Sequence, residues 1–323
     1  MSTALGQRSA LTISGLQTKF HTPQGELTAV DGIDLTVPRG SIVGLVGESG
    51  CGKSTLGRLL LGLLPPTQGQ AFFDGQDLAA LSPRDLRALR RQMQMVFQDT
   101  AASLNPRLDI LGILSEPLRI HQLCPRGDFP ARCAALLDQV GLPRDLLGRY
   151  PHELSGGQRQ RVGIARALAL SPRLVVCDEP VSALDVSVQA QVLNLLADLQ
   201  AARGLTYVLI SHDLGVVRHS ADRVCVMFLG RVCEVGPTKD LFTAPRHPYT
   251  KFLLAAVPRP DPTCRGQGED LLAGEIPSPV HPPSGCPFRT RCPYAQEICA
   301  QQVPPLEGAG DHQAACHFPL GRA

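Results

Sequence analysis

The chain has 323 residues, enough for one or two domains with a large buried core. Hydrophobic residues make up 43% and charged residues 19%, which excludes a disordered chain and a fibre. The formal net charge of +2 lies far from the one-sided balance of a nucleic-acid binder, so no nucleic-acid partner is expected. The longest apolar run, Leu59 to Leu64, is too short to span a bilayer, and no secretory signal is visible. These features predict a cytoplasmic protein.

The N-terminal quarter predicts strands around a glycine-rich loop. Residues 11–20 and 27–37 are β-rich and are separated by a turn at residues 23–25, which predicts an antiparallel pair. Ile42 to Val46 is a short apolar run ended by glycines and is typical of a buried strand. Leucines at helical spacing follow from Lys53 to Leu64, so the predicted order is strand, glycine loop, helix.

A similar alternation returns later in the chain. Leu174 to Cys177 and Tyr207 to Ile210 are candidates for buried strands, and the leucines and valine of residues 192–199 repeat on one helical face. Together with the first strand, they predict an α/β core with a largely parallel sheet. Val224 to Phe228 and Arg231 to Val235 predict a hairpin.

Two further segments differ in composition from this core. Between Gln98 and Tyr150 the chain has helical stretches and no convincing strand, which predicts a helical insert at about residues 99–153. Twelve of the 28 prolines fall between Pro258 and Pro319, together with four clustered cysteines. We therefore expect a main domain at residues 1–257 and a second, small Cys/Pro-rich unit at residues 258–323.

The sequence GESGCGKS fits the phosphate-binding loop pattern and lies between a predicted strand and a predicted helix. Its glycines let backbone N–H groups face phosphates, and the helix N-terminus adds a positive dipole end. Lys53 would reach the β- and γ-phosphates, and Ser54 would ligate Mg²⁺. The loop alone does not separate an ATPase from a small-molecule kinase. The residues expected to contact ATP here are Gly47, Glu48, Ser49, Gly50, Cys51, Gly52, Lys53, Ser54 and Thr55.

The segment LVVCDEP places two carboxylates directly after an apolar strand. Open α/β sheets bind ligands at the carboxyl ends of their strands. Asp178 suits the Mg²⁺ shell, and Glu179 is placed to polarise the water that attacks the γ-phosphate. We therefore predict Glu179 as the catalytic base.

A third motif, LSGGQ at residues 154–158, precedes a predicted helix at residues 159–170. With the two motifs before it, this segment resembles the signature motif of ATP-binding-cassette (ABC) transporter ATPases. SALD at residues 182–185 is similar to their D-loop, His212 to the switch histidine, and Gln98 to the Q-loop residue. All of these motifs lie in the family's order.

This resemblance implies a P-loop NTPase cassette with a RecA-like core, an antiparallel β subdomain and a helical subdomain. It also implies that two cassettes pair head to tail, so that the signature of one chain contacts the ATP of the other. His212 would hold the γ-phosphate in cis, Gln98 would couple Mg²⁺ and the attacking water to the helical insert, and Phe20 would stack on adenine. The residues that would act at the cassette interface are Ser155, Gly156, Gly157, Gln158 and Asp185.

Three longer segments narrow the resemblance to the ATPase subunits of bacterial dipeptide and oligopeptide importers. They are VFQDTAASLNPR (96–107), HPYTKFLLAAVPRPDP (247–262) and GEIPSPVHPPSGCPFRTRCP (274–293). The implied partners are a second, homologous ATPase in a heterodimer, two membrane permease subunits and an extracytoplasmic substrate-binding protein. The chain would then lie at the cytoplasmic face of the bacterial inner membrane. Alternatives are a nickel or glutathione importer, a soluble ABC ATPase acting on DNA or ribosomes, and a P-loop kinase.

Four cysteines, Cys286, Cys292, Cys299 and Cys316, crowd the end of the chain with five, six and sixteen residues between them. This spacing does not match the paired cysteines of zinc ribbons, but four thiolates can hold a [4Fe–4S] cluster. The resemblance implies such a cluster here, with a structural role. Zinc, unligated thiols and a redox-sensing regulator remain alternatives, and the candidate substitute ligands are His312 and His317.

Cys51 lies inside the phosphate-binding loop, close to a predicted helix N-terminus. Such a position favours the thiolate form of a cysteine. We therefore expect alkylation of Cys51 to block ATP, and ATP to protect the thiol.

Overall fold

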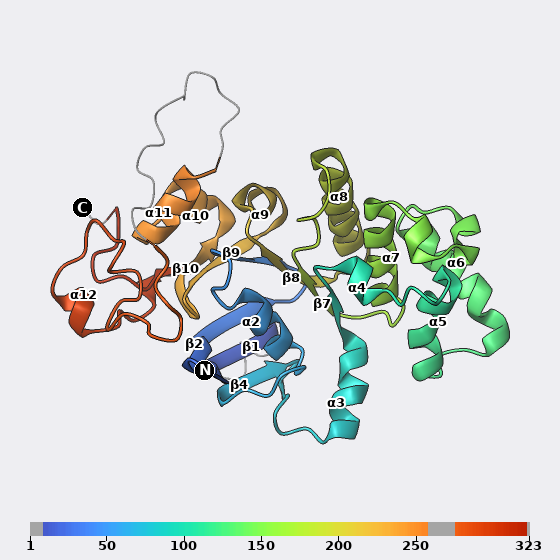
Figure 1. Cartoon of the computed structure of the whole chain (residues 1–323), viewed down its shortest axis with the longest axis horizontal. Helices are drawn as coiled ribbons and strands as arrows, with labels where there is room; N and C mark the ends of the chain where they lie inside the picture. Colours follow the sequence, from blue (N-terminus) through green and yellow to red (C-terminus); the bar gives the residue numbers. More distant parts are fainter. Residues whose placement is uncertain (1–8, 258–274, 322–323) are drawn as a thin grey trace. The chain divides into compact units, whose positions relative to one another are not determined.

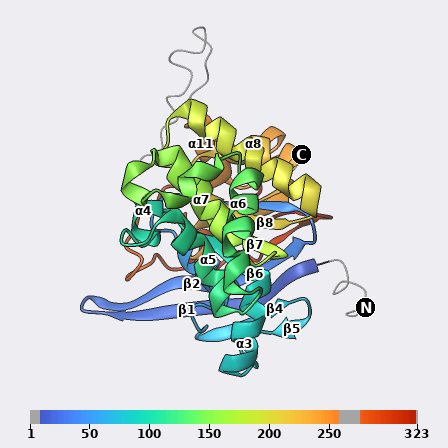
Figure 2. The same cartoon turned by 90° about the vertical axis from the view of Figure 1, so that its right-hand side faces the viewer.

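The computed structural model describes residues 9–257 and 275–321, which divide into two compact units. Unit 1 consists of residues 9–80, 209–257 and 275–321, and unit 2 of residues 81–208. The chain passes between the units twice, once after Ala80 and once within the strand β8 (Thr206–Ser211). Figures 1 and 2 show the elements of each unit.

Unit 1 contains a four-stranded antiparallel sheet in the order β2-β1-β4-β5. Its long β1–β2 hairpin is visible in Figure 2 and confirms the predicted antiparallel pair. The register of the hairpin shifts between Ile13 and Leu16, where Gly15 has a φ of 56°, so a glycine allows a bulge there. The strands are β1 (Ser9–Thr22), β2 (Gly25–Pro38), β4 (Gln68–Phe73) and β5 (Gln76–Asp77).

A second set of strands in unit 1 has the order β11-β12-β10-β9-β3. The pair β3–β9 is parallel, whereas β9–β10, β10–β12 and β11–β12 are antiparallel. The predicted strand at Ile42 to Val46 and the predicted hairpin at residues 224–235 are both confirmed. The strands are β3 (Ile42–Val46), β9 (Arg223–Phe228), β10 (Arg231–Pro237), β11 (Glu307–Ala309) and β12 (His312–Ala314).

The helices of unit 1 are short. The first, α2, ends at Leu60 rather than at Leu64 as predicted, because Gly62 adopts a φ of 61° and closes the helix. The Leu63 N–H donates to the Arg58 carbonyl and the Gly62 N–H to the Leu59 carbonyl, both at 2.9 Å, which is a Schellman motif. These helices are α2 (Lys53–Leu60), α9 (Leu214–Ser220), α10 (Thr238–Thr243), α11 (Pro248–Ala255) and α12 (Ile298–Gln301).

Unit 2 is largely helical, with one parallel strand pair, β6 (Met93–Val96) and β7 (Leu174–Asp178). The predicted helical insert contains α4, α5 and α6 and no strand. The α-helices are α3 (Pro83–Leu89), α4 (Thr100–Ser103), α5 (Ile110–Ile120), α6 (Phe129–Gln139), α7 (Gly156–Leu168) and α8 (Val186–Arg203). The 3₁₀ helices are η1 (Arg90–Gln92), η2 (Arg126–Asp128), η3 (Arg144–Gly148) and η4 (Pro151–Glu153).

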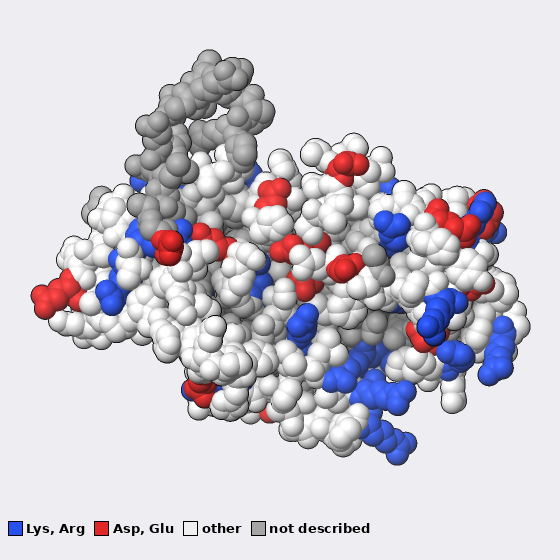
Figure 3. Space-filling view, in the orientation of Figure 1, with Lys and Arg blue, Asp and Glu red and all other residues white. Residues whose placement is uncertain are grey.

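The outer face of α3 carries positive charge. Arg84 and Arg87 are exposed on this helix, and Arg90 and Arg91 follow it in η1. Figure 3 shows basic side chains gathered over α3. Leu89 is buried, so α3 has one solvated, basic side and one packed side.

The C-terminal residues do not form the separate small unit that the sequence led us to expect. Residues 275–321 belong to unit 1, whereas residues 258–274, where that unit was expected to begin, lie outside the described residues. β12 pairs with β10, and His312 Nε2 lies 2.6 Å from Oε1 of the fully buried Glu234. A proline-rich segment of fewer than about 70 residues buries too little apolar surface to form a hydrophobic core alone. By packing on the rest of unit 1, it shares the core of that unit.

The C-terminal segment packs on the rest of unit 1 mainly through aromatic side chains. Phe288, which is only 1% exposed, lies with its ring centroid 5.4 Å from that of Phe228 and 5.2 Å from that of Tyr249. Cys286 and Cys299 belong to the same buried cluster. The C-terminal segment therefore completes the core of unit 1.

None of the helices in the described part of the chain is long and apolar enough to cross a bilayer.

The shared core predicts an unequal effect of two phenylalanine substitutions. Phe288→Ala should lower the free energy of unfolding by about 3–5 kcal/mol, the range for a large buried aromatic side chain. Phe318, which is 37% exposed, is the matched control. Phe318→Ala should change the free energy of unfolding by no more than about 1 kcal/mol. Urea unfolding followed by circular dichroism measures both. Equal losses would contradict the placement of Phe288 in the core.

Candidate functional site

The loop from Gly47 to Ser54, the phosphate-binding loop, fits between its neighbours only because two of its residues are glycines. Gly47 has a φ of 150°, and a Cβ there would lie 2.2 Å from the Met227 carbonyl oxygen. Gly52 has a φ of 101°, and a Cβ there would lie 2.1 Å from the Ala29 carbonyl oxygen. The loop therefore lies against the backbone of both β9 and β2, and a side chain at either glycine would displace it.

Lys53 is buried inside this loop, with 5% of the residue exposed. Its Nζ donates to the carbonyl oxygens of Gly47 at 2.7 Å and Glu48 at 2.9 Å. Ser54 and Thr55 follow in the half-buried first turn of α2. The loop thus surrounds one positive charge at the N-terminus of a helix, which is an arrangement suited to an anion.

Cys51 does not have the reactive environment that the sequence suggested. The residue is only 4% exposed, and burial raises the pKa of its thiol, although the nearby Lys53 ammonium acts in the opposite direction. The expectation of a thiolate favoured by the helix N-terminus is therefore wrong, since desolvation outweighs the local positive charge.

Glu48 has two partners that sequence analysis missed. Its carboxylate accepts from Nη1 and Nη2 of Arg291 at 2.8 and 3.0 Å, and its backbone N–H donates to the Tyr249 hydroxyl at 2.9 Å. Arg291 lies 243 positions further along the chain, and no sequence pattern connects the two residues. The C-terminal segment therefore contacts the phosphate-binding loop directly.

The other predicted residues of unit 1 lie outside the loop. His212 is exposed between β8 and α9, and Asp213 after it caps α9 by accepting from the Gly215 N–H at 2.7 Å. Phe20 lies on β1 opposite Leu27 and is 36% exposed. The side chain of Phe20 is thus partly exposed.

In unit 2 the strand register brings two predicted catalytic residues together. Val96 on β6 pairs with Cys177 on β7, and Gln98 and Glu179 each follow two residues later. Gln98 Nε2 donates to Glu179 Oε2 at 2.8 Å. Asp178, the last residue of β7, is only 3% exposed. An amide and two carboxylates therefore gather at the carboxyl end of this parallel pair.

Glu179 adopts an unusual backbone conformation, with a φ of 46°. A non-glycine residue in this region is strained, and such strain is concentrated at functional sites. The Ser182 Oγ donates to the Glu179 carbonyl at 3.2 Å and helps to hold the turn. Asp74, Gln122, Ser171 and Leu229 also have a positive φ, so this conformation agrees with a functional Glu179 but does not identify it alone.

The segment LSGGQ forms the start of α7 in unit 2. Ser155 is the exposed N-cap, its Oγ accepts from the Gln158 N–H at 3.3 Å, and Gln158 Oε1 accepts from the Ser155 N–H at 3.0 Å. A Cβ at Gly157 would lie 2.5 Å from the Val188 side chain of α8, while Gly156 is half-buried. Asp185 is the N-cap residue of α8. The N-terminus of α7 thus presents a small, exposed hydroxyl.

The four clustered cysteines line one small pocket in unit 1, the cysteine pocket, together with His317. Its cavity is only about 10 Å³, room for about one water molecule. Burial raises the pKa of the Cys286 and Cys292 thiols, and raises that of Cys316 to about 11. All four thiols are free, and among the described residues no three His, Cys, Asp or Glu side chains are arranged to hold a metal ion.

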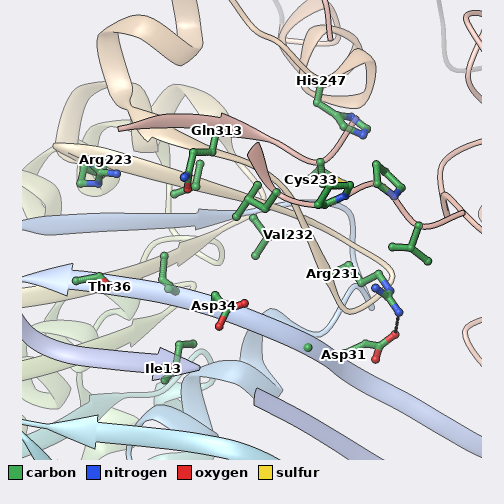
Figure 4. A pocket seen from close by; sticks show the side chains of 18 of the residues that line it. Ile13, Asp31, Asp34, Thr36, Arg223, Arg231, Val232, Cys233, His247 and Gln313 are labelled. Atoms are coloured by element: carbon green, nitrogen blue, oxygen red, sulfur yellow. Dashed lines mark ion pairs between the residues drawn. The ribbon is translucent and has the colours of Figure 1, made fainter. Parts of the chain in front are cut away.

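A larger cavity of about 1120 Å³ lies elsewhere in unit 1, between β2, β10 and the C-terminal segment. Figure 4 shows Arg231 and Asp31 forming an ion pair on its wall, with an N–O distance of 2.6 Å. His247 also lines it, and burial lowers the pKa of that imidazole to about 3. Of the residues that the sequence analysis predicted to act in catalysis, ATP binding or metal binding, only Cys286 lines this cavity.

Comparison with family models gives two matches along the chain. Residues 30–182 match the model of ABC transporters, and residues 233–299 match that of the oligopeptide/dipeptide transporter C-terminal region. The first match contains the phosphate-binding loop and the LSGGQ segment, and the second contains three of the four clustered cysteines.

Individual relatives agree with these models. A putative peptide import ATP-binding protein of Brucella ovis is 52% identical over 307 residues, or 95% of this chain and 96% of the relative. The oligopeptide transport ATP-binding protein OppF of Salmonella typhimurium is 52% identical over 299 residues, or 92% of this chain and 90% of the relative. The solved structure of a dimeric ATP-binding cassette in a post-hydrolysis state with ADP and phosphate superposes with a TM-score of 0.66. That pair is 28% identical, and the match covers 71% of this chain and 98% of the other.

The chain belongs to the ATP-binding proteins of ABC transporters, in the group that carries the oligopeptide/dipeptide transporter C-terminal region. It is an ATPase, and the predicted cassette fold is confirmed by the structural match.

Burial of Cys51 predicts slow chemistry at this thiol. At pH 7, iodoacetamide should modify Cys51 more slowly than the half-buried Cys124, because little of the buried thiol is ionised. Mass spectrometry of digests taken over time measures both rates. ATP with Mg²⁺ should lower the rate of modification of Cys51 further and leave the rate of modification of Cys124 unchanged. Faster labelling of Cys51 would contradict its raised pKa.

Proposed function

We propose that this chain is the ATP-hydrolysing subunit of an importer for dipeptides or oligopeptides. The observation that carries the proposal is the buried Lys53 in a glycine loop at a helix N-terminus, in a chain whose relatives are named as peptide transport proteins. The C-terminal match at residues 233–299 supports the same cargo class. Nickel or glutathione transport remains the second candidate for the cargo, and a soluble ABC ATPase is the more distant alternative.

ATP binding is assigned mainly to the phosphate-binding loop. Lys53 would exchange its two carbonyl partners for oxygens of the β- and γ-phosphates, while the N–H groups at the start of α2 face the same phosphates. Phe20, which is partly exposed, would stack on adenine. The residues that complete this set are Gly47, Glu48, Ser49, Gly50, Cys51, Gly52, Ser54 and Thr55.

Hydrolysis is assigned to the end of the β6–β7 pair. Glu179 would accept a proton from the attacking water, and Gln98, which donates to its carboxylate, would orient both groups. His212 would donate to the γ-phosphate. The oxygen groups of Ser54, Asp178 and Gln98 are the type that Mg²⁺ prefers, and the ion would neutralise phosphate charge.

We further propose that the working unit is a pair of cassettes. The exposed Ser155 at the start of α7, with Gly156, Gly157 and Gln158, would contact ATP held by the partner cassette. The solved relative with ADP and phosphate is dimeric, which supports this arrangement. Asp185 would contribute from the D-loop. The second cassette would be a homologous subunit, so the pair would be a heterodimer.

The remaining partners follow from transport itself. We propose that two membrane permeases supply the path for the cargo, and the relatives named as peptide transport ATP-binding proteins support such partners. The helical insert, with α5 and α6, would dock them at the cytoplasmic face of the inner membrane. An extracytoplasmic substrate-binding protein would deliver the peptide.

The cysteine pocket is proposed to hold a [4Fe–4S] cluster with a structural role. Four thiolates are the donor set of such a cluster, and the four cysteines line one pocket, although in the described residues they are not arranged to hold a metal ion. The cavity of about 10 Å³ is too small for the cluster, so the four side chains must separate when it binds. Zinc, which four thiolates also bind, is the competing occupant.

Replacing Glu179 should separate binding from hydrolysis. Glu179→Gln should leave ATP binding intact and lower turnover by roughly 10²–10⁴, the usual scale for loss of a general base. Phosphate release and equilibrium ATP binding measure the two effects, and Glu297→Gln, at an exposed glutamate, is the matched control. Near-wild-type turnover would refute the role of Glu179. A phosphorylated acceptor in place of free phosphate would favour a kinase.

Anaerobic purification tests the cluster. The full chain should be brown and contain about four iron atoms, the number in one such cluster. Cys299→Ser should remove the colour, whereas Cys124→Ser, outside the cysteine pocket, should keep it. Colourless protein with stoichiometric zinc would overturn the iron–sulfur assignment, and metal-free protein would mean that the thiols stay unligated.

A further inference from the structure

Arg291 lies between Cys286 and Cys292 in the C-terminal segment, and it is more buried than an ordinary surface arginine. Its side chain is 5% exposed, and its guanidinium carbon lies 5.9 Å from the centroid of the Phe228 ring. Both terminal nitrogens donate to the Glu48 carboxylate, while Nε has no hydrogen-bond partner among the described residues. The guanidinium of Arg291 therefore binds one carboxylate in a bidentate manner.

Glu48 is the second residue of the phosphate-binding loop, and three groups hold it. The Lys53 ammonium donates to its carbonyl oxygen, the Tyr249 hydroxyl accepts from its N–H, and Arg291 binds its carboxylate. Tyr249 is fully buried in the same cluster as Phe288. The backbone at Glu48 is thus held by Tyr249 of α11 and by Lys53 of the loop, while Arg291 of the C-terminal segment holds its side chain.

The charge of Glu48 makes this contact relevant to ATP. A carboxylate, 20% exposed at the side chain, in a loop that receives a triphosphate repels the ligand unless a cation neutralises it. Arg291 supplies that charge from a buried position, where solvent screens it little. Loss of Arg291 would leave a partly buried carboxylate without its partner, beside the place where the phosphates bind.

We propose that Arg291 is a positioning residue of the ATP site, which orients and neutralises Glu48 so that the phosphate-binding loop accepts the triphosphate. The proposal rests on ATP binding by this loop, as proposed above. It gives the C-terminal segment a part in nucleotide affinity, in addition to its packing in the core.

Arg289 provides a matched control. It lies two residues away on the same segment, but it donates to the carbonyl and hydroxyl oxygens of Ser284 rather than to the phosphate-binding loop. Substitutions at Arg289 and Arg291 remove the same type of side chain from the same segment. Only the second changes the charge next to Glu48.

The test is equilibrium binding of the non-hydrolysable ATP analogue AMP-PNP with Mg²⁺ to the full chain. Arg291→Gln should raise the dissociation constant about 10-fold, within the usual range of a coupling between sites. Arg289→Gln should leave it unchanged within about 2-fold, which is below the lower end of that range. In turnover assays Arg291→Gln should raise KM for ATP and change kcat little, because Arg291 contacts neither the water nor the γ-phosphate.

A double-mutant cycle separates charge positioning from general destabilisation. Glu48→Gln removes the carboxylate, so Arg291→Gln added to it should have almost no further effect on binding. Additive losses in the double variant would overturn the proposal, as would wild-type affinity of Arg291→Gln. If Arg291→Gln fails to fold, as judged by circular dichroism, the comparison moves to Arg291→Lys. That variant should weaken binding less than 10-fold but measurably, and wild-type affinity in it would overturn the proposal.

Lys53→Ala distinguishes failure of this inference from failure of the proposed function. If Lys53→Ala loses AMP-PNP while Arg291→Gln binds like the wild type, the loop binds nucleotide and the role of Arg291 is wrong. If the wild type and Lys53→Ala bind equally, the assignment of the loop itself is wrong, and with it the proposal that rests on it.

Discussion

The close approach of the phosphate-binding loop to two strands is the constraint on which the rest of unit 1 depends. A Cβ at Gly47 or Gly52 would overlap a carbonyl oxygen of β9 or β2, so the loop can take this path only with glycines. The Gly230 N–H also donates to the Cys51 carbonyl at 3.0 Å, which ties the loop to the β9–β10 turn. Held in this way, the loop keeps the Lys53 ammonium buried against carbonyl oxygens, with no carboxylate partner among the described residues, and that is the charge pattern of an anion site.

The sequence predicted those parts of the fold and site that depend on local patterns. The strand–loop–helix that begins at Ile42 and the strand before Asp178 follow from short apolar runs beside glycines and carboxylates, although the helix was predicted to extend to Leu64 rather than Leu60. The parallel register of β6 and β7 then brings Gln98 next to Glu179. The short strands β5, β11 and β12 were not predicted, because two or three residues carry too little periodicity to identify a strand. β4, with six residues, and β6, with four, were not predicted either.

What the sequence could not predict comes from contacts between distant residues. The contact of Arg291 with Glu48 spans 243 positions, and the burial of Cys51 and Phe288 depends on which segments pack over them. Composition suggested a separate C-terminal unit, but a proline-rich segment without a core of its own is more stable on the aromatic cluster of Phe228 and Tyr249. The segment that carries the four cysteines thus also supplies Arg291, which binds the carboxylate of Glu48.

The central claim is that ATP is held jointly by the phosphate-binding loop of one cassette and the LSGGQ segment of another. Sedimentation velocity of the full-length Glu179→Gln chain, alone and mixed with its cognate cassette, tests it directly. With ATP and Mg²⁺ the account predicts a species of two cassettes, which reverts to single chains with ADP and does not form when Ser155 is replaced by Arg. Single chains under every one of these conditions would contradict the account.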